Sequence, residues 1–217
     1  MASRPKPAQP RRPARLYLMT PQDTAGLEAR LAHSLTAADI AAVLLRLPAA
    51  DERVQIDRAR SLARALQAAG AALLLEGQAH LAAPAGADGA HLAGVAALKS
   101  ALALLKPERI AGCGQLATRH DAMLAGEAGA DYVMFGEPDP AGRRPDFEAV
   151  AERVAWWAEL FEVPCVGYAA ELEEVEPLAA SGADFVAVGD WVFADPRGHA
   201  AALADAARRL SAAEAIS

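Results

Sequence analysis

The sequence predicts a single (β/α)8 TIM barrel, and three observations support this fold class. Eight short apolar segments are interspersed with amphipathic helical segments, which is typical of parallel strands joined by helices. The tripeptide Gly-Ala-Asp occurs three times, each time directly before a predicted strand. The chain has 217 residues, enough for one sizeable core and short for two domains. An open doubly wound sheet is the alternative, but eight such units fit a barrel better.

The predicted strands are the short apolar runs. They cover residues 15–19, 40–47, 71–75, 89–92, 109–113, 132–135, 164–167 and 185–188. The predicted helices are identified by the helical spacing of their apolar residues. They cover residues 23–34, 51–69, 95–105, 118–128, 147–161, 172–180 and 198–210.

The repeated Gly-Ala-Asp tripeptides occupy residues 86–88, 129–131 and 182–184. Glycine suits the left-handed residue that ends a helix, and the apolar run that follows is typical of a buried parallel strand. The aspartates therefore fall at strand starts, the end of a barrel where polar residues serve stability. We assign them no catalytic role.

The charge is unevenly distributed. The net charge is −7, yet five lysines and arginines precede the first acidic residue, Asp23. We expect residues 1–14 to be a disordered, basic, proline-rich leader that is solvated rather than bound to an anionic surface, and residues 15–217 to form the barrel domain. The acidic body argues against nucleic acid as a partner.

Neither a membrane nor a disulfide framework is expected. No apolar run reaches the length of a membrane helix, and the opening residues lack the apolar segment of a signal peptide, so we expect a cytoplasmic protein. Cys113 and Cys165 are the only cysteines, and we interpret both as small apolar core residues rather than reactive groups.

The candidate ligand-binding residues are those that the predicted barrel places at the carboxyl ends of its strands, where barrels carry their function. They are Arg46, Glu76, His91, Glu137, Tyr168 and Asp190. This ring of ionisable groups could bind a small polar molecule at the barrel mouth, or it could form internal ion pairs. No residue is assigned a catalytic role at this stage.

Two of these candidates have open alternatives. His91 could be a general acid or base, or a hydrogen-bonded filler. Arg46 could hold a phosphate, or it could pair with Glu76 on the next strand. After the seventh and eighth strands, where barrels usually bind phosphate, the sequence has the bulky rings of Tyr168 and Trp191, which we expect to obstruct close approach to the backbone.

Several motifs resemble those of the thiamine-phosphate synthase and thiazole tautomerase family. The similar segments are residues 16–20 (LYLMT), 86–92 (GADGAHL), 129–136 (GADYVMFG), 164–167 (PCVG) and 182–188 (GADFVAV). The resemblance extends from about residue 15 to 210 and implies the barrel fold and a role in thiamine biosynthesis. It also implies a reaction that joins a pyrimidine diphosphate to a thiazole phosphate with Mg²⁺.

The sequence departs from the family pattern at most positions to which the resemblance would assign catalysis. Leu44 and Pro48 stand at the places of the family's glutamine and lysine, and Gly77 and Ala96 at those of its two metal-binding acids. Gly114 replaces a serine. A Thr-x-Thr-Lys segment becomes residues 138–143, and Gly-Gly-Ile becomes residues 168–170. We therefore expect no Mg²⁺ and no other cofactor.

Three functions remain. The first is a diverged enzyme or binder of thiamine metabolism without standard synthase activity, which Arg46, Glu76 and His91 favour. The second is a non-catalytic or regulatory partner-binding barrel, which Tyr168 and Trp191 would favour if they filled the mouth. The third is an active synthase with substitute residues. Whether the chain is an enzyme, and whether it forms a homo-oligomer, stays open.

Overall fold

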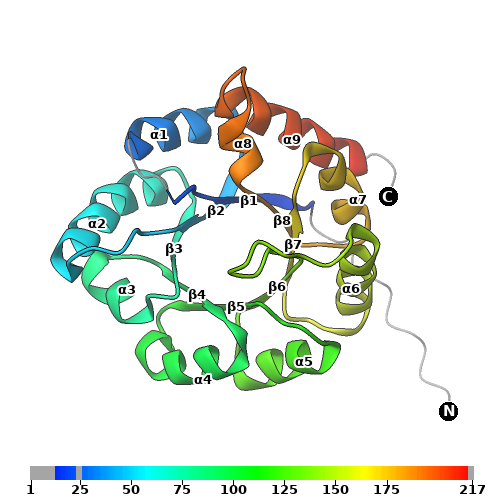
Figure 1. The fold of residues 1–217 in the computed structure, drawn as a ribbon, viewed down its shortest axis with the longest axis horizontal. Helices are drawn as coiled ribbons and strands as arrows, with labels where there is room; N and C mark the ends of the chain where they lie inside the picture. Colours follow the sequence, from blue (N-terminus) through cyan, green and yellow to red (C-terminus); the bar gives the residue numbers. More distant parts are fainter. Residues whose placement is uncertain (1–12, 23–25, 215–217) are drawn as a thin grey trace, which may run out of the picture.

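The computed structural model describes residues 13–22 and 26–214. In them, eight parallel strands form a closed barrel in chain order, and the last strand pairs with the first. Helices surround the barrel on its outside (Figure 1). The predicted (β/α)8 barrel is confirmed, and the open sheet is excluded.

The strands match the predicted apolar runs closely. They are β1 (Arg15–Met19), β2 (Ile40–Leu45), β3 (Ala72–Glu76), β4 (Gly89–Ala93), β5 (Ile110–Gly114), β6 (Tyr132–Phe135), β7 (Cys165–Ala169) and β8 (Phe185–Val188). Of the predicted leader, residues 1–12 lie outside the described residues, and Pro13 and Ala14 precede β1 without regular structure.

The helices include two that the sequence pattern did not predict, α3 and α8. They are α1 (Leu27–Ala37), α2 (Glu52–Ala68), α3 (Ala79–Ala85), α4 (Gly94–Leu105), α5 (Arg119–Ala128), α6 (Phe147–Leu160), α7 (Val175–Ala180), α8 (Asp190–Ala194) and α9 (His199–Glu214), with a 3-10 helix η1 (Leu172–Glu174) before α7. Since α3 has seven residues and contains Pro84, and α8 has five, neither is long enough to show a helical period.

Alternate strand residues face two separate cores. One cluster lies between the sheet and the helices and includes Leu16 and Leu18 of β1. The other lines the barrel interior and takes the intervening positions, such as Tyr17 and Met19. Because successive side chains of a strand point to opposite faces, one apolar run supplies both cores.

The aspartates of the three Gly-Ala-Asp tripeptides each join two neighbouring strands. The carboxylate of Asp88 accepts a hydrogen bond from the backbone N–H of Leu73 at 2.7 Å, and Asp131 accepts one from Ala111 at 2.7 Å. Asp184 accepts one from Cys165 at 2.8 Å. Each aspartate also donates its own N–H to the carbonyl of the same partner. The predicted structural role is confirmed.

Asp39, which precedes β2, makes a related link. The Arg15 side chain at the start of β1 donates to its carboxylate at 3.0 and 2.8 Å. Each even-numbered strand is thus preceded by an aspartate that contacts the odd-numbered strand before it. These contacts fix the strand starts, at the end of the barrel opposite the carboxyl-terminal rim.

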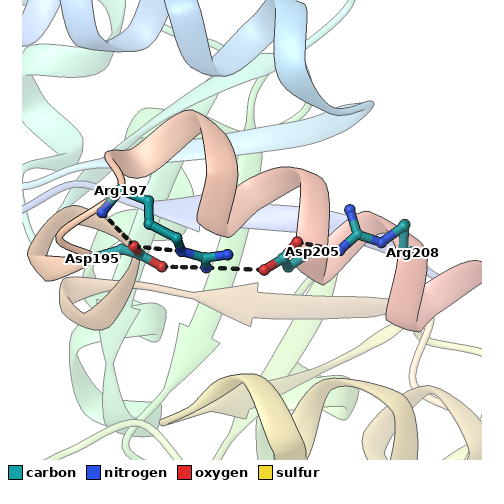
Figure 2. Close-up of polar contacts among 4 residues, drawn as sticks. All are labelled: Asp195, Arg197, Asp205 and Arg208. Atoms are coloured by element: carbon teal, nitrogen blue, oxygen red, sulfur yellow. Dashed lines mark hydrogen bonds and ion pairs between the residues drawn. The ribbon is translucent and has the colours of Figure 1, made fainter.

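A second polar network links the turn between α8 and α9 to helix α9 (Figure 2). Arg197 donates to Asp195 at 2.7 Å and to Asp205 at 2.9 Å, and Arg208 also pairs with Asp205. Single surface ion pairs contribute little, but this network joins the turn before α9 to the helix itself. It lies on the outside of the barrel, so we assign it a structural role.

Both cysteines are buried, as predicted. Burial raises the pKa of the Cys113 thiol to about 12, so the thiolate that a reactive cysteine needs does not form near neutral pH. No helix among the described residues is long and apolar enough to cross a membrane.

The strand-linking aspartates predict a measurable stability effect. Replacing Asp184 by alanine removes the acceptor of the Cys165 N–H, and we expect the free energy of unfolding to fall by about 1–2 kcal/mol in urea titrations. Asp184→Asn keeps a side-chain oxygen and serves as the matched control, with a smaller loss. An unchanged stability of Asp184→Ala would contradict a structural role for this carboxylate.

Candidate functional site

A cavity of about 510 Å³ opens at the carboxyl ends of the strands, the rim that we call the mouth. This volume lies in the range typical of small-molecule sites. Its lining residues come from the ends of six strands, β1 to β5 and β8, and from the loop after β6. They are Met19, Gln22, Arg46, Glu76, Gly77, His91, Ala93, Gln115, Glu137, Pro138, Asp139, Pro140, Gly142 and Asp190.

Five of the six candidate ligand-binding residues line this cavity. They are Arg46, Glu76, His91, Glu137 and Asp190. The sixth, Tyr168, is 5% exposed and belongs to the core inside the barrel. Trp191 does not line the cavity either, because its ring packs against the outer core and its Nε1 donates to the Ala169 carbonyl at 3.0 Å. Trp191 therefore does not fill the mouth, the condition under which it would have favoured a partner-binding barrel.

Arg46 is held between two carboxylates. Its Nη1 lies 3.3 Å from Asp190, and its Nε lies 3.9 Å from Glu76. The Thr20 hydroxyl accepts the backbone N–H of Arg46 at 3.0 Å, which fixes the end of β2. The pairing with Glu76 that the sequence left open is therefore present, and Asp190 adds a partner that sequence reasoning did not assign.

The pKa of the Glu76 carboxyl is shifted by three effects. Burial raises the pKa of its carboxyl, the positive charge of Arg46 lowers it, and the negative charge of Asp190 raises it further. The net direction is upward. Burial of this carboxyl, together with the charge of Asp190, thus outweighs the attraction of Arg46.

His91 is anchored through one ring nitrogen. Its Nδ1 lies 2.8 Å from the hydroxyl of Tyr132, and the two rings stack at 5.7 Å between centroids. The Tyr132 hydroxyl is in turn 2.9 Å from that of Tyr17. Burial lowers the pKa of His91 to about 4, so the imidazole is neutral near pH 7. The hydrogen-bonded interpretation holds for Nδ1, while Nε2 lies on the cavity side.

Glu137 is a partly buried carboxyl with a fixed orientation. Its Oε1 accepts a hydrogen bond from the backbone N–H of Gln115. Burial raises the pKa of Glu137 to about 7, although hydrogen bonds from the backbone N–H groups of Gln115 and of Glu137 itself act in the opposite direction. A carboxyl that titrates near neutral pH inside a cavity is a frequent mark of a functional group.

Gly114 provides the space for this pair of side chains. A Cβ at this position would lie 2.0 Å from Oε1 of Glu137 and 2.5 Å from Nε2 of His91. Any larger residue would collide with both. A glycine at position 114 is therefore required by the neighbouring Glu137 and His91.

The loop between β6 and α6 covers part of the mouth and reaches over the centre of the barrel (Figure 1). Asp139 accepts hydrogen bonds from the backbone N–H groups of Ala141 and Arg143 and from the Arg143 guanidinium. Arg144 pairs with Glu174 at 3.0 Å, which ties the loop to the segment after β7. Both loop arginines are thus engaged by carboxylates.

The residues present do not fit the Mg²⁺ that the family resemblance implies. Glu76 is paired with Arg46, and Gly77 offers no side-chain oxygen. Among the described residues, no group of three histidine, cysteine, aspartate or glutamate side chains is arranged to hold a metal ion. Magnesium prefers several hard oxygen ligands in near-octahedral geometry.

The sequence matches the family described as "Thiamine monophosphate synthase" over residues 16–192. The chain belongs to this family. A protein of Rhodospirillum centenum named thiamine-phosphate synthase is 40% identical over 196 residues, which is 88% of this chain and 95% of that protein. A protein of Hyphomonas neptunium with the same name is 36% identical over 206 residues, covering 90% of this chain and 93% of that protein.

A solved structure supports the fold independently of close sequence similarity. The thiamine phosphate pyrophosphorylase from Pyrococcus furiosus superimposes with a TM-score of 0.78 at 18% identity. The match covers 92% of this chain and 96% of that protein. At this identity the likeness establishes the barrel alone. The resemblance inferred from the sequence motifs is confirmed at the level of the family.

Sequence reasoning missed Tyr17, Tyr132 and Gln115 as parts of the site. Tyr17 lies within β1 and Tyr132 begins β6, so both rings lie inside the barrel. They are linked to the cavity lining through the hydrogen bond between Tyr132 and His91. Gln115 has a positive φ of 52°, unusual for a residue other than glycine, and this conformation aims its N–H at Glu137. The glycines of the Gly-Cys-Gly-Gln segment indicated an unusual backbone conformation. The sequence did not indicate that the N–H of Gln115 would bond to Glu137.

Glu137 gives a pH-dependence that can be measured. Its folded pKa of about 7 lies above the ordinary value of 4.5, so between these values the folded state holds more protons than the unfolded state. Stability should therefore fall as pH rises through this window, and Glu137→Gln should be more stable than wild type above pH 7 by up to about 3 kcal/mol. Carboxyl-carbon NMR should give a titration midpoint near 7.

The exposed Glu52, for which no such burial exists, provides the control substitution Glu52→Gln. It removes a carboxyl outside the mouth, so comparison of the two variants isolates the contribution of Glu137. A Glu137 midpoint near 4.5 would contradict the buried state of this carboxyl.

Proposed function

We propose that this member of the thiamine monophosphate synthase family binds a small molecule of thiamine biosynthesis at the barrel mouth and lacks the standard synthase activity. In this proposal it is a diverged member, and its ligand is a pyrimidine or thiazole compound that carries little or no phosphate. Family membership supports the link to thiamine biosynthesis. The charge of the mouth supports the departure from the standard reaction.

The observation that carries the proposal is that carboxylates already surround Arg46. Among the described residues that line the cavity, Arg46 is the only lysine or arginine. Its guanidinium is already paired with Asp190 and lies near Glu76. Glu137 and Glu76 add negative charge whenever they ionise, so a diphosphate entering this cavity would meet more carboxylates than cations. Such an environment disfavours the leaving diphosphate of the synthase reaction.

A neutral or cationic ligand suits the same cavity. Carboxylates accept hydrogen bonds from ring or amino N–H groups, and neutral His91 offers a further polar contact. We extend the proposal to the metal: binding requires no Mg²⁺, because the donor set does not suit that ion. We place the protein in the cytoplasm.

The second candidate function is a non-catalytic, partner-binding barrel. A mouth filled by aromatic rings would have favoured it. Instead, Trp191 packs outside the barrel, Tyr168 lies below the rim, and a cavity of small-molecule size remains. These observations favour the small-molecule binder over a closed structural barrel.

The absence of synthase activity is a direct expectation. Incubation with the family's pyrimidine diphosphate and thiazole phosphate, with and without Mg²⁺, should yield no thiamine phosphate, while a relative that carries the complete motifs forms it under the same conditions. Loss of one preorganised electrostatic partner commonly costs about 100- to 1000-fold in rate, and several are replaced here. Mg²⁺-dependent turnover of about one per second, abolished by Arg46→Ala, would refute the proposal.

Thermal-shift measurements test the binding part. Thiamine, its pyrimidine and thiazole precursors, and their phosphates are each added at increasing concentration. We expect an unphosphorylated compound to raise the melting temperature, by a free energy that grows as RT ln(1 + [L]/Kd), and its phosphate to have less effect. Glu76→Gln should reduce the preference, and Glu52→Gln on the outer helices should not. Stabilisation by the phosphates alone would contradict the proposed ligand class.

A further inference from the structure

A buried chain of hydrogen bonds ends at the cavity. It runs from the Tyr17 hydroxyl through the Tyr132 hydroxyl to Nδ1 of His91, with distances of 2.9 and 2.8 Å. Tyr17 is 2% exposed, and among the described residues the Tyr132 hydroxyl is the only hydrogen-bond partner of its hydroxyl. A buried O–H without an acceptor costs about 1–3 kcal/mol, so the stable arrangement has Tyr17 donating to Tyr132.

This direction determines the tautomer of His91. Since the Tyr132 oxygen accepts from Tyr17, the Tyr132 proton is donated to Nδ1 of His91. A neutral imidazole whose Nδ1 accepts a hydrogen bond carries its proton on Nε2. His91 and Glu137 both line the cavity, and Nε2 of His91 is 2.5 Å from the point where a Gly114 Cβ would lie. His91 therefore holds its N–H donor beside Gly114, next to Glu137.

Glu137 lies across from this donor. Its Oε1 and Nε2 of His91 both lie within 2.5 Å of the point where a Gly114 Cβ would be, yet within the described part of the chain no direct hydrogen bond joins them. The Gln115 N–H holds the carboxyl in place. The two groups border one gap, which is the geometry for contacting the same ligand through two neighbouring atoms.

Building on the proposed function, we infer that Nε2–H of His91 and the carboxylate of Glu137 form a donor–acceptor pair that binds the edge of a neutral nitrogen heterocycle. The ligand offers an accepting carbonyl oxygen or ring nitrogen to His91 and a neighbouring N–H to Glu137. Lactams and 2-amino-substituted azines share this edge. Two parallel hydrogen bonds in a fixed geometry would orient the ring and select against compounds that lack either group.

The charge of Glu137 controls the strength of the acceptor. The titratable groups that face this carboxyl are Tyr17, His91, Cys113, Tyr132 and Arg153. Burial keeps the tyrosines and the thiol protonated and His91 neutral, so Arg153 supplies the remaining charge and favours the carboxylate. Because burial raises the Glu137 pKa to about 7, the strong acceptor is present above this pH and is lost below it. Affinity for the neutral ligand therefore rises with pH.

The probe for this pair is 2-pyridone, a neutral lactam, titrated into the isotope-labelled full chain and followed by NMR at pH 5.5 and pH 8.5. We expect binding to be roughly five- to tenfold tighter at the higher pH, since hydrogen bonds to charged groups are stronger than those to neutral groups. N-methyl-2-pyridone has the same ring and carbonyl but no N–H. It should bind more weakly and without this pH dependence.

Variants separate the two members of the pair. Glu137→Gln should remove the pH dependence, because an amide oxygen accepts at either pH. His91→Phe keeps a ring to stack on Tyr132 and should weaken binding at both pH values by roughly tenfold. Gly114→Ala should abolish the selectivity for the N–H, because its Cβ fills the gap. Glu52→Gln, which alters the exposed pair with His80, is the matched control and should behave as wild type.

Equal binding of the two lactams by wild type would overturn the inference, as would a pH dependence that persists in Glu137→Gln. Circular dichroism and thermal melts verify that each variant is folded. If His91→Phe does not fold, the test rests on Glu137→Gln. If a thiamine-related compound stabilises wild type and Glu137→Gln alike while 2-pyridone does not bind, the pair is refuted and the proposed function stands. If no such compound stabilises the wild type, the proposed function fails by itself.

Discussion

Pairing between β1 and β8 closes the sheet, and this closure gives all eight parallel strands a common carboxyl-terminal rim. Side chains that are far apart in the chain meet there: Arg46 and Asp190 are 144 positions apart and lie in contact. The aspartates at the opposite end hold neighbouring strands in register through their backbone N–H groups. The frame is therefore fixed at one end while the chemistry is carried at the other.

The mouth brings several carboxyl groups together with little compensating positive charge. Burial raises the pKa values of Glu76 and Glu137, which means that the protein bears part of the cost of desolvating them. Arg46 offsets some of this cost by lying between Glu76 and Asp190. Among the described residues the buried Nε of Arg46 has no hydrogen-bond partner, so this offset is incomplete. The pKa of Glu137, about 7, leaves that carboxyl near its titration point at neutral pH.

Space at the mouth is as restrictive as charge. Glu137 occupies the position that a side chain at residue 114 would need, so the two sites are coupled: a glycine at one permits a carboxyl at the other. The same carboxyl accepts a hydrogen bond from the N–H of Gln115, a residue whose backbone is left-handed. Gly114, Gln115 and Glu137 thus form one local packing arrangement at the ends of β5 and β6. A side chain at position 114 would displace the carboxyl of Glu137.

The apolar runs, the helical spacing and the three Gly-Ala-Asp tripeptides determined the fold class by themselves, because strand length and helix ends are set by local side-chain chemistry. They also located the rim, and hence Arg46, Glu76, His91, Glu137 and Asp190, since a residue that follows a parallel strand must lie at its carboxyl end. Only the tertiary structure decided what these residues contact. The Tyr17–Tyr132–His91 chain, the inward burial of Glu137 and the outward packing of Trp191 depend on strand register and loop conformation. Both arise from contacts between segments that are distant in the sequence, where local patterns carry no information.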